Sequence, residues 1–282
     1  MIVFKEILPL TKHLAALKKE GQSIGLVPTM GALHDGHLSL IELSNKQLDI
    51  TVASIFINPT QFNDPKDFEK YPVTIEKDTT ILENAGCDIL FLPAISEIYP
   101  GGIKPFMHYE LGDIEHLLEG KFRPGHFQGV AQVVHRLIDI VLPDHLFLGS
   151  KDYQQCMVIK KLVKIINAKV NLVTSETFRE ENGLAMSSRN LRLSPLQKEQ
   201  ASAIYKSLLD IKNNYSNTPF STLEQKAFAY LLQNGFNKVD YVSIADASSL
   251  LPAEVGQQQH LVVLIAAFIG DVRLIDNMVI AE

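Results

Sequence analysis

The alternation of strand-like and helix-like segments through the first two thirds of the chain constrains the fold most strongly. Short apolar runs rich in β-branched residues predict strands at 24–27, 50–57, 88–92, 145–148 and 170–173. Helical patterns lie between them, near 10–20, 37–47, 74–85, 128–141 and 153–167. Such alternation is typical of βαβ units, so we expect an α/β, Rossmann-like domain with a mainly parallel sheet. Ligands of these sheets bind beyond the carboxyl ends of the strands.

The last third of the chain follows a different order. Two amphipathic helices, over about 195–213 and 221–234, precede three predicted strands at 239–245, 260–269 and 272–280. Gly270-Asp271 separates the last two strands and indicates a tight hairpin. We therefore expect a smaller α+β domain with an antiparallel sheet, which covers the site. The expected domains are 1–177 and 178–282.

Composition excludes several classes of protein. The chain has 282 residues, 46% hydrophobic and 21% charged, as expected of a globular protein with one large domain or two. A net charge of −6 argues against a nucleic-acid partner, although a local pocket can still attract a small anion. The longest apolar run, 261–269, is too short to span a bilayer, and the N-terminus has no export signal. With only two cysteines, we expect a cytoplasmic protein without disulfides or membrane contact.

The stretch PTMGALHDGH, at 28–37, places two histidines in a glycine-rich turn before a helical pattern. His34 and His37 would lie at a helix N-terminus, where free backbone N–H groups and the helix dipole attract anions. Gly31 and Gly36 would let a ligand approach the backbone closely. The turn is thus a candidate phosphate cradle; a metal site and an ordinary buried turn are the alternatives.

Two familiar motifs fit this turn poorly. The glycine spacing is that of a P-loop, but His37 and Leu38 stand where lysine and serine or threonine belong. A zinc site would need a third and preferably a fourth ligand at compatible distance. Asp35 is adjacent, yet neighbouring side chains on a helical segment do not face the same point. We therefore name no metal ligand in the protein.

Other unusual loops also follow predicted strands or open helices. GSKDYQQ, at 149–155, places a lysine and an aspartate after the fourth strand, and AMSSRN, at 185–190, offers two hydroxyls and a guanidinium that can bind a polyphosphate. FINPTQF, at 56–62, ends the second strand, and RPGHF, at 123–127, begins a helix. Each signal alone is also compatible with a solvated loop. Their coincidence at one edge of one sheet favours a site for a phosphorylated ligand.

These stretches together resemble the pantothenate synthetase (pantoate–β-alanine ligase) family. PTMGALHDGH, FINPTQF, RPGHFQGV, FLGSKDYQQ and GLAMSSRN occur in the family's order and spacing, over nearly the whole chain. The HxGH form alone indicates only the wider superfamily of HIGH-motif nucleotidyltransferases. The resemblance implies ATP-dependent condensation of (R)-pantoate with β-alanine to give pantothenate, AMP and pyrophosphate, through a pantoyl adenylate. Such a reaction requires neutralised phosphates and in-line positioning more than a protein nucleophile.

The resemblance also implies roles for individual residues. His34, His37 and Lys151 would be catalytic: the histidines would contact the phosphates, and the lysine would stabilise charge on the α-phosphate. Gln61 and Gln155 would hold the pantoate hydroxyls, while Arg123 would lie at the pocket rim.

The remaining nucleotide contacts implied by the resemblance surround adenine, ribose and the outer phosphates. Met30 and Phe178 would lie near adenine, the latter through its backbone. The ribose and phosphate contacts would be Gly149, Asp152, Met186, Ser187, Ser188 and Arg189.

The family also suggests Mg²⁺ bound with ATP, held mostly by phosphate oxygens and water, and a homodimer. Asp78 is a candidate outer-shell contact to that ion. The chain departs from the family at Asn182, where aspartate is usual, and at Gln132, where threonine is common. Neither change removes an implied catalytic group.

Two rival functions share part of this pattern. A nucleotidyltransferase that keeps AMP on its product would carry HxGH and a serine–arginine loop but would need no amine. A nucleotide-binding module without activity would be expected to have lost some of the reactive side chains. The retention of His34, His37, Lys151 and Arg189 argues against the second rival.

Overall fold

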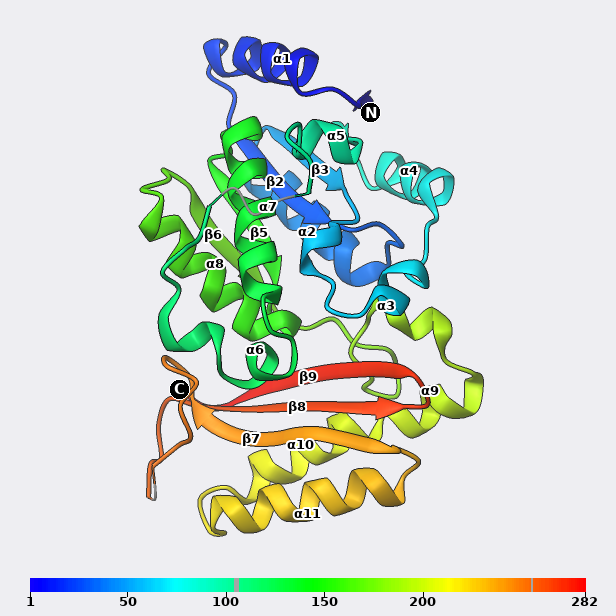
Figure 1. Ribbon diagram of the computed structural model, residues 1–282, viewed down its shortest axis with the longest axis vertical. Coiled ribbons are helices and arrows are strands. Elements are labelled where there is room, and N and C mark those ends of the chain that lie inside the picture. The colour runs from blue at the N-terminus through cyan, green and yellow to red at the C-terminus, as the bar shows by residue number, and fades with distance from the viewer. Residues whose placement is uncertain (104–106, 255) are drawn as a thin grey trace.

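The computed structural model describes residues 1–103, 107–254 and 256–282. Two parts stack end to end, a larger one around a six-stranded sheet and a smaller one around a three-stranded sheet (Figure 1). The large sheet is wholly parallel, with strand order β1-β4-β3-β2-β5-β6. Its strands are β1 Ile2–Phe4, β2 Ile24–Thr29, β3 Ile50–Ile55, β4 Ile89–Phe91, β5 His145–Gly149 and β6 Asn171–Ser175.

The predicted α/β architecture with a Rossmann-like parallel sheet is confirmed. The sequence patterns missed β1, an edge strand of three residues that is largely exposed and therefore shows no apolar run. The major helices agree with the predicted patterns: α1 Ile7–Lys19, α2 Asp35–Gln47, α4 Ile75–Asn84, α7 His126–Val141 and α8 Tyr153–Ile165. Three short helices were also missed, because four or five residues cannot establish a period. They are α3 Pro65–Glu69, α5 Ile95–Ile98 and α6 Leu118–Phe122.

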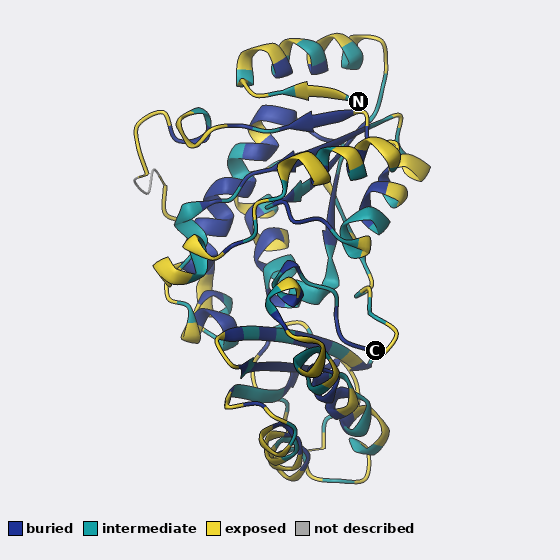
Figure 2. Ribbon diagram, turned by 90° about the vertical axis from the view of Figure 1, so that its right-hand side faces the viewer, coloured by how far each residue is buried: buried dark blue, intermediate teal, exposed yellow. Residues whose placement is uncertain are grey.

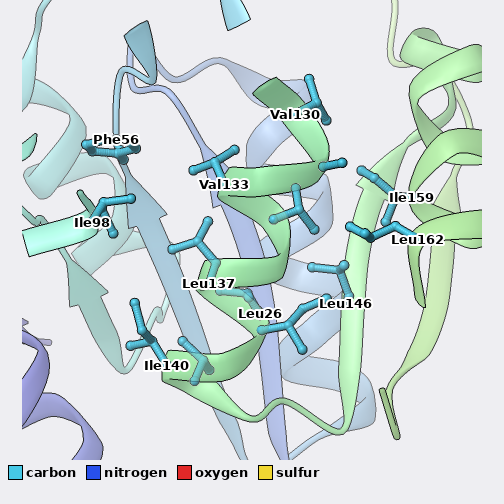
Figure 3. Close-up of a cluster of buried hydrophobic side chains, with 14 of the residues drawn as sticks. Leu26, Phe56, Ile98, Val130, Val133, Leu137, Ile140, Leu146, Ile159 and Leu162 are labelled. Atoms are coloured by element: carbon cyan, nitrogen blue, oxygen red, sulfur yellow. The ribbon is translucent and has the colours of Figure 1, made fainter. Parts of the chain in front are cut away.

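Helix α7 organises the core of the larger part. Most of its residues are buried, because VAQVVHRLIDIVL provides apolar side chains nearly all round the helix. Figure 3 shows Val133, Leu137 and Ile140 of α7 in one buried cluster with Leu26 of β2 and Leu146 of β5. Burial of one such side chain stabilises a fold by roughly 1.5–3 kcal/mol. This packing holds α7, and the loops at its start, firmly against the sheet.

The order of the strands defines a switch point. The chain passes from β2 to β3 on one side and later returns to β5 on the other side of β2. Loops that follow β2 and β5 therefore diverge, and a crevice opens at the carboxyl ends of these two strands. PTMGALHDGH follows from β2, and GSKDYQQ follows from β5.

The described residues of the smaller part form the predicted antiparallel sheet and three helices, where two helices were expected. The helices are α9 Pro195–Ala201, α10 Ala203–Asn214 and α11 Phe220–Gln233, and the strands, in sheet order, are β7 Lys238–Asp246, β8 Leu261–Ile269 and β9 Val272–Ala281. The single helix expected over 195–213 is interrupted at Ser202, whose hydroxyl donates back to the carbonyl of Glu199. Gly270 adopts φ +58° between β8 and β9, in the expected hairpin.

Apolar contacts join the two parts. Leu250 and Leu264 of the smaller part pack with Leu117 and Met157 of the larger one. Figure 2 shows the central strands of both sheets as buried, whereas the outer faces of the peripheral helices are exposed. No helix in the described part of the chain is long and apolar enough to cross a membrane.

Candidate active site

A cavity of about 230 Å³ lies at the switch point, at the ends of β2 and β5. All the residues that the sequence assigned to the site line it: Met30, His34, His37, Gln61, Arg123, Gly149, Lys151, Asp152, Gln155, Phe178, Met186, Ser187, Ser188 and Arg189. A second cavity of about 290 Å³ adjoins it and shares Arg123, Lys151 and Arg189. Six separate stretches of sequence thus meet in one place.

The two histidines form one unit at the start of α2. His34 is the N-cap residue, and its backbone N–H donates to Nδ1 of His37 at 3.3 Å. Because Nδ1 of His37 accepts this bond, a neutral His37 carries its proton on Nε2. The ring centroids lie 4.1 Å apart. A Cβ on Gly36 would come within 3.0 Å of the His34 ring, which explains why glycine separates the histidines.

Asp78 holds this loop from behind. Its carboxylate is 1% exposed and accepts the backbone N–H groups of Ala32 at 2.8 Å and Leu33 at 2.9 Å. The hydroxyl of Thr74 donates to both of its oxygens, at 3.1 and 3.0 Å. These bonds stabilise Ala32 at φ +50°, a conformation that is strained for a residue with a side chain. The structure therefore gives Asp78 a loop-holding role, and the expectation of an outer-shell magnesium contact finds no support in it.

Both histidines are neutral at pH 7. Burial, followed by the charge of Lys151, lowers the pKa of His34 to about 4. Burial lowers the pKa of His37 well below its usual value, with further contributions from His34 and Lys151. Neutral imidazole can donate a hydrogen bond to a phosphate oxygen without a change of charge.

Stability is expected to fall as the pH drops from 6.5 towards 4. His34, His37 and His126 have lowered pKa values in the folded protein, that of His126 being about 3 because of burial and the charge of Arg123. The unfolded chain therefore binds more protons in this range than the folded protein does. The contribution of the three histidines to the free energy of unfolding is thus complete above pH 6.5 and is lost on acidification. We expect the Tm at pH 4.5 to lie at least about 5 °C below that at pH 6.5.

Calorimetry at the two pH values checks this expectation. His126→Gln should reduce the difference in Tm, whereas His116→Gln, at an exposed position, should leave it unchanged. If the wild type and His126→Gln showed the same difference in Tm between the two pH values, the buried imidazole of His126 would not contribute to the loss of stability on acidification.

Lys151 lies on the short 3₁₀ turn η3, Ser150–Asp152, that follows β5. Its Nζ is 3.6 Å from Oδ1 of Asp152, and its side chain is 16% exposed. The backbone of this turn is held by Asn277 of β9, whose Nδ2 donates to the carbonyls of Ser150 at 2.9 Å and Lys151 at 2.7 Å. Asn277 was not found from the sequence, although it positions the lysine.

The second loop, GLAMSSRN, docks on the first. Ser188 donates to the carbonyl of Ala32 at 3.0 Å, and Ser187 caps the 3₁₀ turn η4, Ser188–Arg192, by accepting the N–H of Arg189. The guanidinium of Arg189 pairs with Asp67 of α3, 2.7 Å from Nη2 to Oδ2. Burial alone would raise the pKa of Asp67, but Arg189 outweighs it and the pKa is lowered.

Gln61 lies on the 3₁₀ turn η1, Pro59–Gln61, and lines the cavity together with Lys151. Its Nε2 lies 2.8 Å from Sδ of Met30. Met30, which was expected near adenine, thus also contacts Gln61. Asn58, also missed from the sequence, is 1% exposed and bonds both Gln61 Oε1 and the carbonyl of Gly129. A Cβ on Gly129 would lie 2.3 Å from the Thr60 carbonyl oxygen, so α7 supports this turn directly.

The two consecutive glutamines of α8 have separate roles. Gln155 lines the cavity, whereas Gln154 is buried and bonds the backbone of Glu119, Ile114 and Leu117. A sequence pattern cannot separate these neighbours, because the choice depends on the rotation of α8.

The two departures from the family pattern are accommodated locally. Asn182 accepts the N–H of Leu184 at 3.0 Å, as an aspartate could, and also donates to the carbonyl of Lys198. Gln132 is buried on α7 and donates to the carbonyl of Met107 at 2.9 Å. Neither side chain lines the cavity.

The chemistry of the site is that of an enzyme that activates a substrate with a nucleotide. Cationic and neutral donors converge where an anion would sit, at a helix N-terminus beyond a parallel sheet. Burial raises the pKa of Cys87 to about 11 and that of Cys156 to about 12, so neither thiol is a ready nucleophile. This combination defines a nucleotide-dependent α/β transferase or ligase.

Comparison with known proteins gives the particular family. The family model for pantoate-beta-alanine ligase matches residues 2–279, and the chain belongs to this family. It is 44% identical to the pantothenate synthetase of Cytophaga hutchinsonii over 283 residues, with 99% of each chain covered. The pantothenate synthetase of Buchnera aphidicola is 40% identical, with 98% of each chain covered.

Solved structures agree. Pantothenate synthetase from Thermus thermophilus superposes with a TM-score of 0.92 at 37% identity, over the whole of both chains. Pantoate-beta-alanine ligase from Francisella tularensis, complexed with beta-gamma ATP and beta-alanine, gives 0.84 at 38% identity, covering 99% of this chain and 98% of that one. The chain is therefore a carbon–nitrogen ligase that catalyses the ATP-dependent condensation of pantoate with β-alanine.

Proposed function

We propose that this cavity performs both half-reactions with the residues assigned above. In the first, a carboxylate oxygen of pantoate attacks the α-phosphorus of ATP, and the bond to the bridging oxygen breaks as pyrophosphate leaves. In the second, the amine of β-alanine attacks the acyl carbon, AMP departs, and the amine loses a proton. The observation that supports this most directly is the convergence of both histidines, Lys151 and Arg189 on one cavity at the switch point.

The charges and donors suit phosphate transfer. Lys151 would stabilise the charge that develops on the α-phosphate, and the Nε2–H of His37 would donate to the departing pyrophosphate. His34 would contact the phosphates beside it. Ser187, Ser188 and Arg189 would close over the β- and γ-phosphates, with Met186 leading the loop; Arg189 would then exchange Asp67 for a phosphate.

The remaining contacts divide between nucleoside and acid. Gly149 and Asp152 would lie along the ribose, and the backbone of Phe178 near adenine; the Phe178 carbonyl already accepts the N–H of Met186. Gln61 and Gln155 would bind the pantoate hydroxyls, with Met30 against Gln61. Arg123 is proposed at the rim of the pantoate pocket.

Magnesium is proposed to enter with ATP. Among the described residues no group of three or more His, Cys, Asp or Glu side chains is placed to hold a metal ion, and both Asp78 oxygens are engaged. The ion would therefore be bound by phosphate oxygens and water, where it neutralises negative charge. We name no protein ligand for it.

We also propose a cytoplasmic homodimer with domains 1–177 and 178–282. Separate hydrophobic cores support this division, since the core of the smaller part contains buried residues only from Leu184 onward. The homodimer is what the family resemblance implies, and the cytoplasmic location is expected from the low number of cysteines.

Separate measurement of the half-reactions tests this proposal. With ATP and pantoate alone, we expect a burst of about one pyrophosphate per active site, because the adenylate stays bound. Free AMP should appear only after β-alanine is added. A nucleotidyltransferase that keeps AMP on its product would release pyrophosphate without any response to β-alanine, which would contradict the proposal.

A further inference from the structure

A buried ionic cluster connects the smaller domain to the turn that carries Gln61. Glu119 of α6 is 6% exposed, and its two oxygens accept both terminal nitrogens of Arg273 of β9 at 2.7 Å. Tyr241 of β7 donates to the same carboxylate at 2.7 Å. On its other side, Glu119 lies 3.7 Å from the guanidinium of Arg123. Figure 1 shows α6 above the small sheet, next to β9, and the Glu119–Arg273 pair joins these two elements.

Arg123 continues the connection to Gln61. Its Nη2 donates to the backbone carbonyl of Gln61 at 3.3 Å, and its Nη1 lies 3.1 Å from Nε2 of His126. Because a guanidinium cannot accept a hydrogen bond, Nε2 of His126 must be the acceptor. Its proton is then on Nδ1, which donates to the same Gln61 carbonyl at 2.8 Å. Arg123 Nη2 and His126 Nδ1 thus both donate to the backbone carbonyl of Gln61.

We propose that Glu119 is a positioning residue for pantoate, which couples Arg273 of the smaller domain, through Arg123, to the turn that carries Gln61. This inference rests on the proposed function, in which Gln61 binds pantoate. Glu119 lines the adjoining cavity but not the one that contains the histidines, so it acts through Arg123 and not on the substrate.

The electrostatics of the cluster support this role. Burial alone would raise the pKa of Glu119, but the hydrogen bonds and charge of Arg273 outweigh it and hold the pKa at about 2. The carboxylate is therefore ionised at neutral pH. Its charge orients Arg123, since a neutral group there would leave the guanidinium with its hydrogen bonds to a carbonyl and an imidazole and with the charge of Asp67, but without the ion pair to Glu119.

Glu119→Gln tests the coupling, because it keeps the shape of the side chain and removes its charge. We expect the KM for pantoate to rise about tenfold, since loss of fixed geometry weakens a positioned contact. The KM for ATP should stay within about twofold, because the hydrogen bonds of Glu119 and Arg123 run to Arg273, Tyr241, Gln61 and His126, and none of these bonds involves His34, His37 or the serine–arginine loop. Unchanged KM values, or an equal rise for both substrates, would overturn the proposal and leave Glu119 a purely structural link.

A matched pair of tyrosines provides the second measurement, which remains decisive if Glu119→Gln does not fold. Tyr241→Phe removes one bond between domains, to Glu119, and Tyr153→Phe removes another, from α8 to the carbonyl of Ala247 at 2.8 Å. Only Tyr241→Phe should raise the KM for pantoate, by about threefold. Equal effects of the two variants on this KM would overturn the proposal.

Gln61→Ala separates failure of this proposal from failure of the proposed function. If Gln61→Ala leaves the KM for pantoate unchanged, Gln61 does not bind pantoate and the proposed function fails at that residue. If it raises the KM while Glu119→Gln does not, only the coupling fails. In the double variant the two effects should be less than additive, because both act on the same contact.

Discussion

Replacement of Lys151 by alanine is expected to slow pyrophosphate release from ATP and pantoate by about two orders of magnitude or more. The lysine is largely buried, lies beside the histidine pair and is the side chain assigned to the α-phosphate. In the proposed role, the charge of Lys151 would stabilise the transition state more than the bound substrates, so we expect kcat to fall more than the KM for ATP rises. Rapid-quench measurement of a single turnover checks this.

Lys160→Ala provides the control for that experiment, since Lys160 is an exposed residue of α8, the helix that follows the Lys151 turn. It should leave the rate unchanged. A near-normal rate for Lys151→Ala would mean that the charge of Lys151 is not used at the α-phosphate.

Asp78→Ala is expected to have the second largest effect, on stability and rate together. Its carboxylate satisfies two buried N–H groups of the histidine loop, and each unsatisfied group costs about 1–3 kcal/mol. We expect the free energy of unfolding to fall by about 3 kcal/mol. Adenylate formation should fall more than about tenfold, because the strained Ala32 would relax and move His34.

Urea denaturation and pyrophosphate release measure the two effects of Asp78→Ala. Asp64→Ala is a suitable comparison, because Asp64 caps α3 at an exposed position and should cost only about 1 kcal/mol. A loss of stability no larger than that of Asp64→Ala would contradict the role of Asp78 as the anchor of the loop.

The fold was largely predictable because its main elements are long and periodic. The strands around Leu26 and Leu146 are short, continuous apolar runs, and α7 has an unmistakable helical pattern. The elements that were missed, such as β1 and α3, are too short or too exposed to produce a period. The break at Ser202 depends on a local side-chain bond, which hydrophobic spacing does not report.

The candidate site was predictable where its residues lie in one contiguous stretch. His34 and His37, or Ser187 to Arg189, present their chemistry together in the sequence. Asp78 was named from the sequence only as an outer-shell contact to magnesium. Its role in holding the loop, and the role of Glu119, could not be found in this way, because each residue reaches its partners from a distant part of the chain. A local sequence pattern also cannot distinguish Gln154 from Gln155, since the packing of α8 determines which of the two side chains faces the cavity.

The contact between Asn277 and the Lys151 turn has a consequence for the order in which the site is assembled. The two residues are 126 positions apart, so during synthesis the lysine turn exists long before the amide that holds it. Until β9 has been made, the Lys151 turn lacks one of the two strands that support it. We therefore expect this turn to become fully ordered only after β9 has left the ribosome and closed its hairpin.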